Sequence, residues 1–293
     1  MQAIIDLLYG NKFYMKTILV PTDFSPTATN AGHYAVHLAG QLNCSKIVLY
    51  HAYQIPVVTD AVLTPVELVG IDEIKEASEI GLAKFIGALK AYAGADSPLE
   101  FVSISEFAFL TESIDEVCKV NDIDLVVIGI TGGDKIDEVL MGSNTISVAK
   151  HTTVPVIIVP AKAAFTPIKE VVLACDFKKI IETIPVEPVK KLITETGAKL
   201  FVLNITHGSK DAGNKTSFES YTLDTLLQGL NPEYHFIDHA DFTEGINQFV
   251  TANQVDLIIT MPKKHGWFEG LFKRSHTKML AFHSHVPLVV MHD

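Results

Sequence analysis

Glycines and hydroxyl side chains are spaced in one segment as they would be in a phosphate-binding loop. Gly129 and Gly132 are separated by two residues, and nine residues later the run Gly142-Ser143-Asn144-Thr145 opens a predicted helix. Glycines let the backbone approach a ligand closely, and the N–H groups at a helix N-terminus point at anions. The hydroxyls of Ser143 and Thr145 would add donors, so the chemistry expected here is phosphate binding.

A carboxylate is predicted at the same edge of the fold. Asp23 follows the apolar run Thr17–Pro21, and the glycine loop follows the apolar run at 124–129. Short apolar runs of this kind are typical of buried parallel strands. Because open α/β sheets bind ligands at the carboxyl ends of their strands, Asp23 could contact a nucleoside or a metal ion on its phosphates.

The elements that must position these residues alternate between strands and helices. Ser25-Pro26 predicts a helix start, as an N-cap and first helical residue, and the apolar positions that follow form one helix face. Further strands are predicted at 46–51, 99–106 and 156–159, and further helices at 67–92, 112–120 and 143–151. This alternation predicts an α/β fold with a parallel, doubly wound sheet.

The pattern occurs twice. The segment from Met15 to Phe24 reappears 153 residues later, and the fourth predicted strand reappears at 256–260, at an offset of 132. The two offsets differ by 21, so the second copy is shorter between its second and fourth strands. We therefore predict an N-terminal extension over residues 1–14, a first domain over 15–162 and a second over 168–293, with the linker at 161–167.

Length and composition exclude several classes of protein. A chain of 293 residues, 48% of them hydrophobic, suffices for about two domains. A net charge of −11 argues against nucleic-acid binding, and no apolar run approaches the about 20 residues of a membrane span. Segment 1–14 is a poor signal peptide, so a cytoplasmic location is expected. The three cysteines are too few and too scattered to predict a disulfide framework. The twelve histidines do not form a recognised zinc-ligand motif, so no metal site is assigned.

Three motifs in order carry a resemblance to a known family. Gly-x2-Gly-x9-Gly-Ser, the Val-Pro-Thr-Asp that ends at Asp23, and Pro155-Val-x-x-Val-Pro160 together resemble the ATP-binding universal stress proteins. The likeness covers roughly 16–160 and, more weakly, 169–292. It implies two tandem five-stranded, Rossmann-like domains, with ATP and Mg²⁺ at the carboxyl edge of the first and a regulatory role in the stress response.

The resemblance also implies which residues bind the nucleotide. The residues expected to flank the adenosine are Pro21, Thr22, Asp23, Tyr50, His51 and Ala52. Those expected to hold ribose and phosphates are Gly129, Gly132, Gly142, Ser143 and Asn144, with Ile128, Thr131 and Thr145 beside them. At the offset of 132, Met261, Lys264 and Arg274 replace the three glycines, so the second domain is predicted to lack an ATP site.

In this family the last strands of two domains pair edge to edge, and the short apolar runs at 156–159 and 288–291 suit such pairing. An intrachain pseudo-dimer is therefore expected, and two chains could associate further. Two alternatives remain open. The glycines could form only turns and a helix cap in an interaction module without a nucleotide. The protein could also be an enzyme that slowly hydrolyses ATP with Mg²⁺, although no catalytic residue is assigned because no base or nucleophile motif is present.

Overall fold

A computed structural model describes residues 15–55, 70–130, 143–175, 184–206, 215–261 and 286–291. The predicted extension over residues 1–14 and the first residues of the predicted helix at 67–92 lie outside these ranges. The first half comprises β1 (Thr17–Pro21), α2 (Pro26–Leu42), β2 (Lys46–Tyr53), α3 (Ile71–Ala93), β3 (Glu100–Phe107), α4 (Leu110–Val120), β4 (Leu125–Ile130), α5 (Ser143–His151) and β5 (Val156–Pro160). The second comprises β6 (Glu170–Ala174), α7 (Val186–Thr196), β7 (Lys199–Thr206), α8 (Lys215–Leu226), β8 (Glu233–Asp238), α9 (Phe242–Ala252), β9 (Leu257–Thr260) and β10 (Leu288–Val290).

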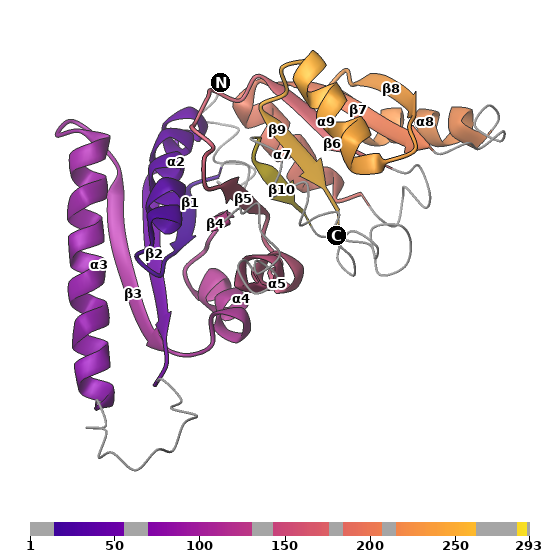
Figure 1. The fold of residues 1–293 in the computed structure, drawn as a ribbon. Coiled ribbons are helices and arrows are strands. Elements are labelled where there is room, and N and C mark those ends of the chain that lie inside the picture. The colour runs from indigo at the N-terminus through magenta and orange to yellow at the C-terminus, as the bar shows by residue number, and fades with distance from the viewer. Residues whose placement is uncertain are drawn as a thin grey trace, which may run out of the picture.

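The ten strands form one sheet in the order β3-β2-β1-β4-β5-β10-β9-β6-β7-β8 (Figure 1). Neighbouring strands are parallel within each half. Only the central pair is antiparallel: β10 runs against β5, with Leu288 opposite Ile158 and Val290 opposite Val156. The α/β fold with two five-stranded parallel halves is confirmed, and the two short apolar runs pair with each other at the centre of one continuous sheet, as the sequence predicts.

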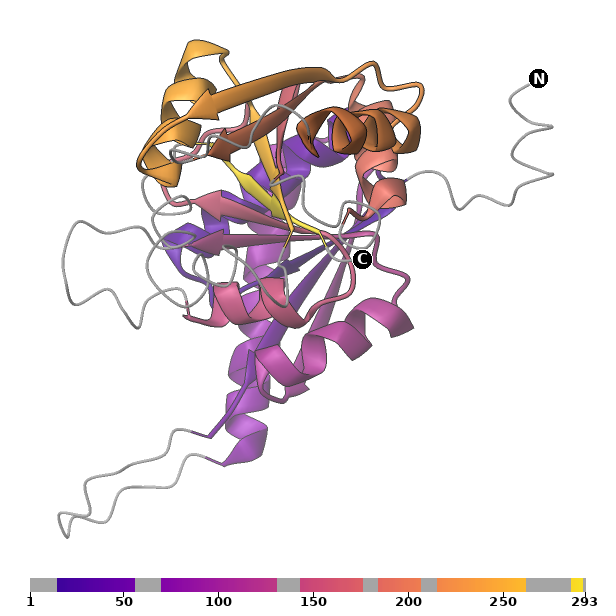
Figure 2. The same cartoon turned by 90° about the vertical axis from the view of Figure 1, so that its right-hand side faces the viewer.

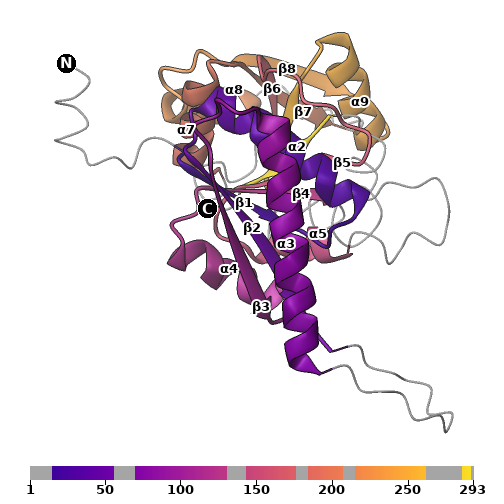
Figure 3. The same cartoon turned by 90° about the vertical axis from the view of Figure 1, so that its left-hand side faces the viewer.

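Helices cover both faces of the sheet. α2, α3, α7 and α8 pack on one face, whereas α4, α5 and α9 pack on the other. Strand side chains alternate between the faces, so Ile18 and Val20 contact the first layer and Leu19 the second. The predicted apolar stripe of α2 is buried in the first layer. In Figure 3, α3 lies in front of the first-half sheet, with its upper part beside α2.

The two halves hold their first strands by the same contact. Asp124 Oδ2 accepts hydrogen bonds from the backbone N–H groups of Lys16 and Thr17, at 2.8 and 3.2 Å. Asp256 Oδ2 accepts the equivalent pair from residues 169–170, at 2.8 and 3.0 Å. Each carboxylate thereby ties the residues at the start of the first strand of its half to the start of the fourth, which sets the register at the centre of each parallel sheet.

The shortening of the second half lies almost entirely between its second and third strands. β2 and β3 start 54 residues apart, at 46 and 100, whereas β7 and β8 start 34 residues apart, at 199 and 233. In the same interval α3 has 23 residues and α8 has 12. The first half therefore carries a long surface helix that the second half does not reproduce; Figure 2 shows it extending from the body. Within the described ranges, no helix combines the length and apolar composition needed to cross a membrane.

The segment between the halves docks on α2. Gln41 Nε2 donates to the carbonyl of Ile168 at 2.8 Å, and the Ile168 N–H donates back to Gln41 Oε1 at 2.9 Å. The ring of Phe165 lies edge-on to Tyr34 and stacks on His37, with centroids 5.1 and 5.3 Å apart. The residues joining the halves are thus held by polar and aromatic contacts with the first half.

Replacing Gln41 with leucine is expected to destabilise the chain by about 1–3 kcal/mol, because both backbone polar groups of the buried Ile168 lose their partner. The free energy of unfolding in urea measures the effect. Gln228→Leu, at an exposed position, serves as the control. Equal unfolding midpoints for the two variants would show that the amide contact contributes nothing.

Candidate functional site

A cavity of about 240 Å³ lies at the carboxyl ends of β1, β2 and β4. The residues that sequence analysis assigned to a site and that line this cavity are Pro21, Thr22, Asp23, Tyr50, His51, Ala52, Ile128, Gly129, Asn144 and Thr145. Four more lining residues, which the motifs did not single out as ligand contacts, are Ser25, Thr27, Ala28 and Leu110. Thr131, Gly132 and Gly142 lie outside the described residues, and Ser143 is described only as the first residue of α5.

A network of local hydrogen bonds shapes the loop between β1 and α2. The Thr22 N–H donates to the Tyr50 carbonyl at 2.9 Å, which extends the pairing of β1 with β2. Thr22 Oγ1 accepts from the Phe24 N–H at 2.9 Å, and Asp23 Oδ1 accepts from the Ser25 N–H at 3.0 Å. The Asp23 side chain stays exposed at the cavity, so its carboxylate is available to a ligand.

At Gly129, near the end of β4, the first turns of α2 and α5 pack closely against the strand. A Cβ atom on this glycine would lie 2.6 Å from the Thr27 carbonyl oxygen and 2.7 Å from Thr27 Cγ2. Thr145 Oγ1 donates a hydrogen bond to the Gly129 carbonyl at 2.9 Å. The first turns of α2 and α5 are thus both drawn against the end of β4. The Thr145 hydroxyl therefore donates its proton to a backbone carbonyl, whereas the sequence led us to expect that it would donate to a phosphate.

Tyr50 is buried beneath the cavity, where its hydroxyl donates to Glu106 Oε2 at 2.9 Å and bonds to Ser113 Oγ at 2.6 Å. Burial raises the pKa of this phenol above its ordinary value, so it stays neutral at physiological pH. No sequence motif identified Glu106 or Ser113, because both belong to elements that pair with or pack on β2 only in the folded chain.

His51 is held in place by a chain of hydrogen bonds through side chains of α3 and β3. Its Nδ1 bonds to Ser78 Oγ of α3 at 2.7 Å, and Ser78 Oγ bonds to Ser105 Oγ of β3 at 2.7 Å. Burial lowers the pKa of His51, and the nearby Asp23 carboxylate acts in the opposite direction. With burial as the larger effect, the imidazole is neutral at pH 7 and can either donate or accept a hydrogen bond.

The described residues offer little to metal or nucleophilic chemistry. Among them, no group of three or more His, Cys, Asp and Glu side chains is arranged to hold a metal ion. Cys44, Cys118 and Cys175 are buried cysteines. Burial raises the pKa of Cys44 and of Cys118 to about 12, so these two sulfurs are unreactive thiols at neutral pH.

Residues 15–160 match the family model described as the universal stress protein family. The chain belongs to the universal stress protein family. A universal stress protein from Archaeoglobus fulgidus DSM 4304 has a similar structure, with TM-score 0.69 and 18% identity over 96% of this chain and 97% of that one. A functionally unknown protein from Pseudomonas aeruginosa PAO1 gives TM-score 0.56 and 10% identity, over 95% and 93% of the two chains.

A single-domain universal stress protein from Lactobacillus plantarum aligns with half of the chain, at 23% identity and TM-score 0.40, covering 50% of this chain and 97% of that one. No curated protein sequence matches the chain. The whole-length likeness to the Archaeoglobus fulgidus protein shows that the ten-strand arrangement is the fold of a universal stress protein, and the Pseudomonas aeruginosa protein shares this arrangement. At these identities they concern the fold and not the ligand.

In this universal stress protein, the second half differs at the edge that corresponds to the cavity. Met261 stands where the first half has Gly129, and its side chain is buried. The Cys175 N–H donates to the Leu203 carbonyl at 2.9 Å, as its counterpart does in the first half. Here, however, the buried side chain of Asn204 donates to the Cys175 carbonyl at 2.8 Å. The backbone hydrogen bond between the first two strands is kept, while the buried side chains of Met261 and Asn204 occupy the strand ends.

Proposed function

We propose that this universal stress protein binds ATP at the carboxyl edge of its first half and acts as a nucleotide-dependent regulator in the stress response. The observation that carries the proposal is the single cavity that joins the end of β1, the end of β2, Gly129 and the start of α5. The first and last of the lining residues, Pro21 and Thr145, are 124 residues apart in sequence, and the segments were assigned to the nucleotide from separate motifs and from the family resemblance.

The charges of the cavity favour one orientation of the nucleotide. Asp23 is the one Asp, Glu, Lys or Arg among its described lining residues. A carboxylate accepts hydrogen bonds from ribose hydroxyls or an exocyclic amine and repels phosphate, so we place the nucleoside beside Asp23 and His51. We place the phosphates beside Gly129 and the N-terminus of α5, where the helix dipole favours anions.

The size of the cavity fits this division. About 240 Å³ is slightly less than the roughly 300–1,000 Å³ typical of sites for drug-sized ligands. We therefore assign the described cavity to the nucleoside, and the motif residues Gly132, Gly142 and Ser143 to the phosphates. A Mg²⁺ ion bound through the phosphate oxygens would offset the phosphate charge.

We further propose that the second half binds no ATP and serves as a built-in partner for the first. Met261 and Asn204 fill the strand ends that the first half leaves open. The antiparallel β5–β10 pair joins the halves as the edges of two separate domains would join in a dimer. The proposed domain boundaries are 15–162 and 168–293, and any homodimer would use surfaces other than these two edges.

Titration of Mg·ATP into the full chain by calorimetry tests the proposal, and one site per chain is expected. Gly142→Arg reproduces the residue present in the second half and is expected to abolish binding without changing the unfolding midpoint. Absence of binding by the native chain would favour an interaction module that needs no nucleotide. Turnover lost in Asp23→Ala and kept in Asp176→Ala would favour an ATP hydrolase instead.

A further inference from the structure

Phe24 has a backbone conformation that is rare for a bulky residue. Its φ angle is +63°, in the left-handed region that glycine and asparagine visit more readily. The residue lies between Asp23, which lines the cavity, and Ser25, which caps α2. A left-handed residue at this point reverses the chain as it leaves β1. Contacts elsewhere must therefore hold Phe24 in this conformation.

The contacts that hold Phe24 come from the end of β2 and from α3. Its ring lies against the imidazole of His51, with ring centroids 4.6 Å apart. On the side of α3 it meets Gly81 so closely that a Cβ atom there would lie 2.7 Å from Phe24 Cζ and 2.8 Å from Cε2. The absence of a side chain at Gly81 therefore creates the space that the ring occupies.

A second contact from the same helix reaches the cavity wall. Ser78, three residues before Gly81 and so on the same face of α3, bonds to His51 Nδ1 at 2.7 Å. One helix face thus supports both Phe24 and His51. α3 is otherwise a surface helix, with only Ser78, Leu82, Phe85 and Leu89 buried among its 23 residues. In Figure 3 it crosses the first-half strands with its outer side uncovered in that view.

We propose that Phe24 and Gly81 are positioning residues through which α3 sets the conformation of the Asp23 loop, and thereby the affinity of the cavity for the nucleoside. This inference rests on the proposed function, since it concerns the same site. Neither residue needs to touch the ligand. A displacement of α3 would move the Phe24 ring, and the ring carries the backbone on which Asp23 and Ser25 are placed.

Gly81→Ala tests the inference in the full chain. The added methyl group overlaps the Phe24 ring, and His51 lies against that ring, so the Asp23 loop must shift. We expect the dissociation constant of ATP, measured by calorimetry, to rise about tenfold. The matched control is Gly87→Ala in the same helix, where a Cβ atom would have no other heavy atom within 4 Å. This control should bind ATP as tightly as the native chain.

A double-mutant cycle separates positioning from a general loss of stability. In a Phe24→Leu background the large ring is gone, so Gly81→Ala should change ATP affinity by less than about twofold. Equal losses in both backgrounds would overturn the inference, as would native affinity in the Gly81→Ala single variant.

If Gly81→Ala does not fold, Phe24→Gly is used instead. It accepts the positive φ angle but lacks the ring, so its ATP affinity should fall when measured at a temperature at which the variant is fully folded. Unchanged affinity would overturn the inference. Absence of ATP binding by the native chain would instead refute the proposed function itself.

Discussion

Replacing Gly129 with alanine is expected to abolish ATP binding and to lower the free energy of unfolding by about 1–3 kcal/mol. The new Cβ atom would lie 2.6 Å from the Thr27 carbonyl oxygen and 3.0 Å from its carbonyl carbon. Both are backbone atoms of the first turn of α2, so rotation of a side chain cannot relieve the overlap. The start of α2 must move away from β4, which separates two walls of the cavity. Calorimetry and urea unfolding measure the two effects.

A second substitution shows which atoms cause the loss. Thr27→Ser removes Cγ2, which lies 2.7 Å from the added methyl group, but leaves the carbonyl oxygen in place. Adding Thr27→Ser to Gly129→Ala should therefore restore neither stability nor binding. Recovery of both would assign the overlap to the threonine side chain alone. Native ATP affinity in the Gly129→Ala single variant would contradict the placement of the nucleotide beside the end of β4.

The fold follows from local patterns because those patterns are strong and repeated. Ser25-Pro26 places the start of α2, and the structure confirms Ser25 as the N-cap. Four-to-eight-residue apolar runs become the central strands because only a sheet covered on both faces can bury them completely. The ends of β1 and β4 were found by the same reasoning, whereas the residues at the end of β2 were assigned from the family resemblance. Because parallel strands present their carboxyl ends at one edge, ten of the assigned residues line one cavity.

The supports of the cavity could not be predicted in this way. Ser78 and Gly81 meet the cavity residues only because α3 packs across the sheet at one particular register, which helix periodicity does not determine. The positive φ angle of Phe24 has no signal either, since phenylalanine rarely adopts it. β2 continues two residues beyond its predicted end, to Tyr53, because β3 pairs with it as far as Phe107. Each of these depends on contacts between segments distant in sequence.

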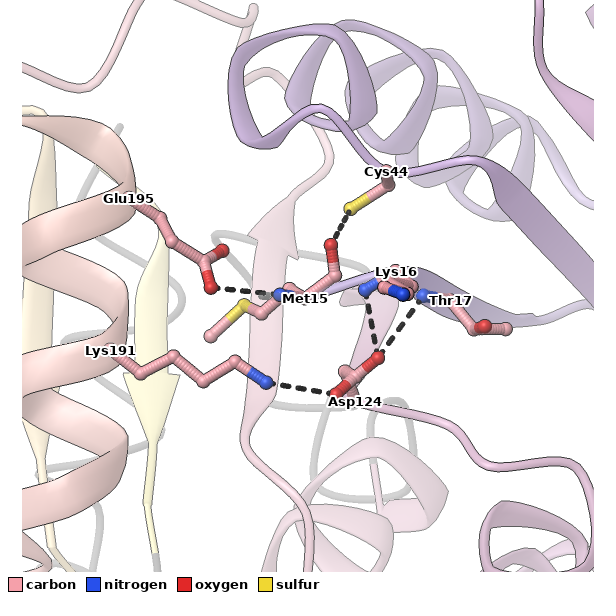
Figure 4. A network of polar contacts seen from close by, with 7 residues as sticks. All are labelled: Met15, Lys16, Thr17, Cys44, Asp124, Lys191 and Glu195. Atoms are coloured by element: carbon pink, nitrogen blue, oxygen red, sulfur yellow. Dashed lines mark hydrogen bonds and ion pairs between the residues drawn. The ribbon is translucent and has the colours of Figure 1, made fainter. Parts of the chain in front are cut away.

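A second network lies where the first half meets α7 of the second (Figure 4). The Met15 N–H donates to Glu195 Oε1 at 2.8 Å, while Glu195 Oε2 is buried without a partner. Lys191 Nζ lies 2.9 Å from Asp124 Oδ1 and therefore forms its ion pair with Asp124 and not with Glu195. Burial raises the pKa of Glu195 to about 7, and Asp124 adds to this, whereas the Met15 N–H and Lys191 lower it. The Cys44 thiol completes the network by donating to the Met15 carbonyl at 3.2 Å.

Glu195→Gln is expected to stabilise the chain above pH 7 by about 1–2 kcal/mol and to have little effect near pH 4.5. A carboxyl whose pKa is raised from 4.5 to about 7 holds its proton in the folded chain longer than in the unfolded chain. Native stability therefore falls as the pH rises from about 4.5 to about 7, and the glutamine variant lacks this fall. Converting the whole pKa shift at about 1.4 kcal/mol per unit would give a larger change in the free energy of unfolding. The Glu195 side chain is only half buried, however, so solvent screening reduces the effect.

Two neighbouring substitutions should move the pH dependence in opposite directions. Lys191→Met removes the cation that lowers the pKa of Glu195, so the fall in stability should extend to higher pH. Asp124→Asn removes the carboxylate that raises it, so the fall should end at lower pH, on top of a constant loss because Lys191 loses its partner. Urea unfolding at half-unit intervals from pH 5 to pH 8 distinguishes these cases. Parallel curves for Glu195→Gln and the native chain would mean that Glu195 titrates normally and that the contact between the halves does not respond to pH.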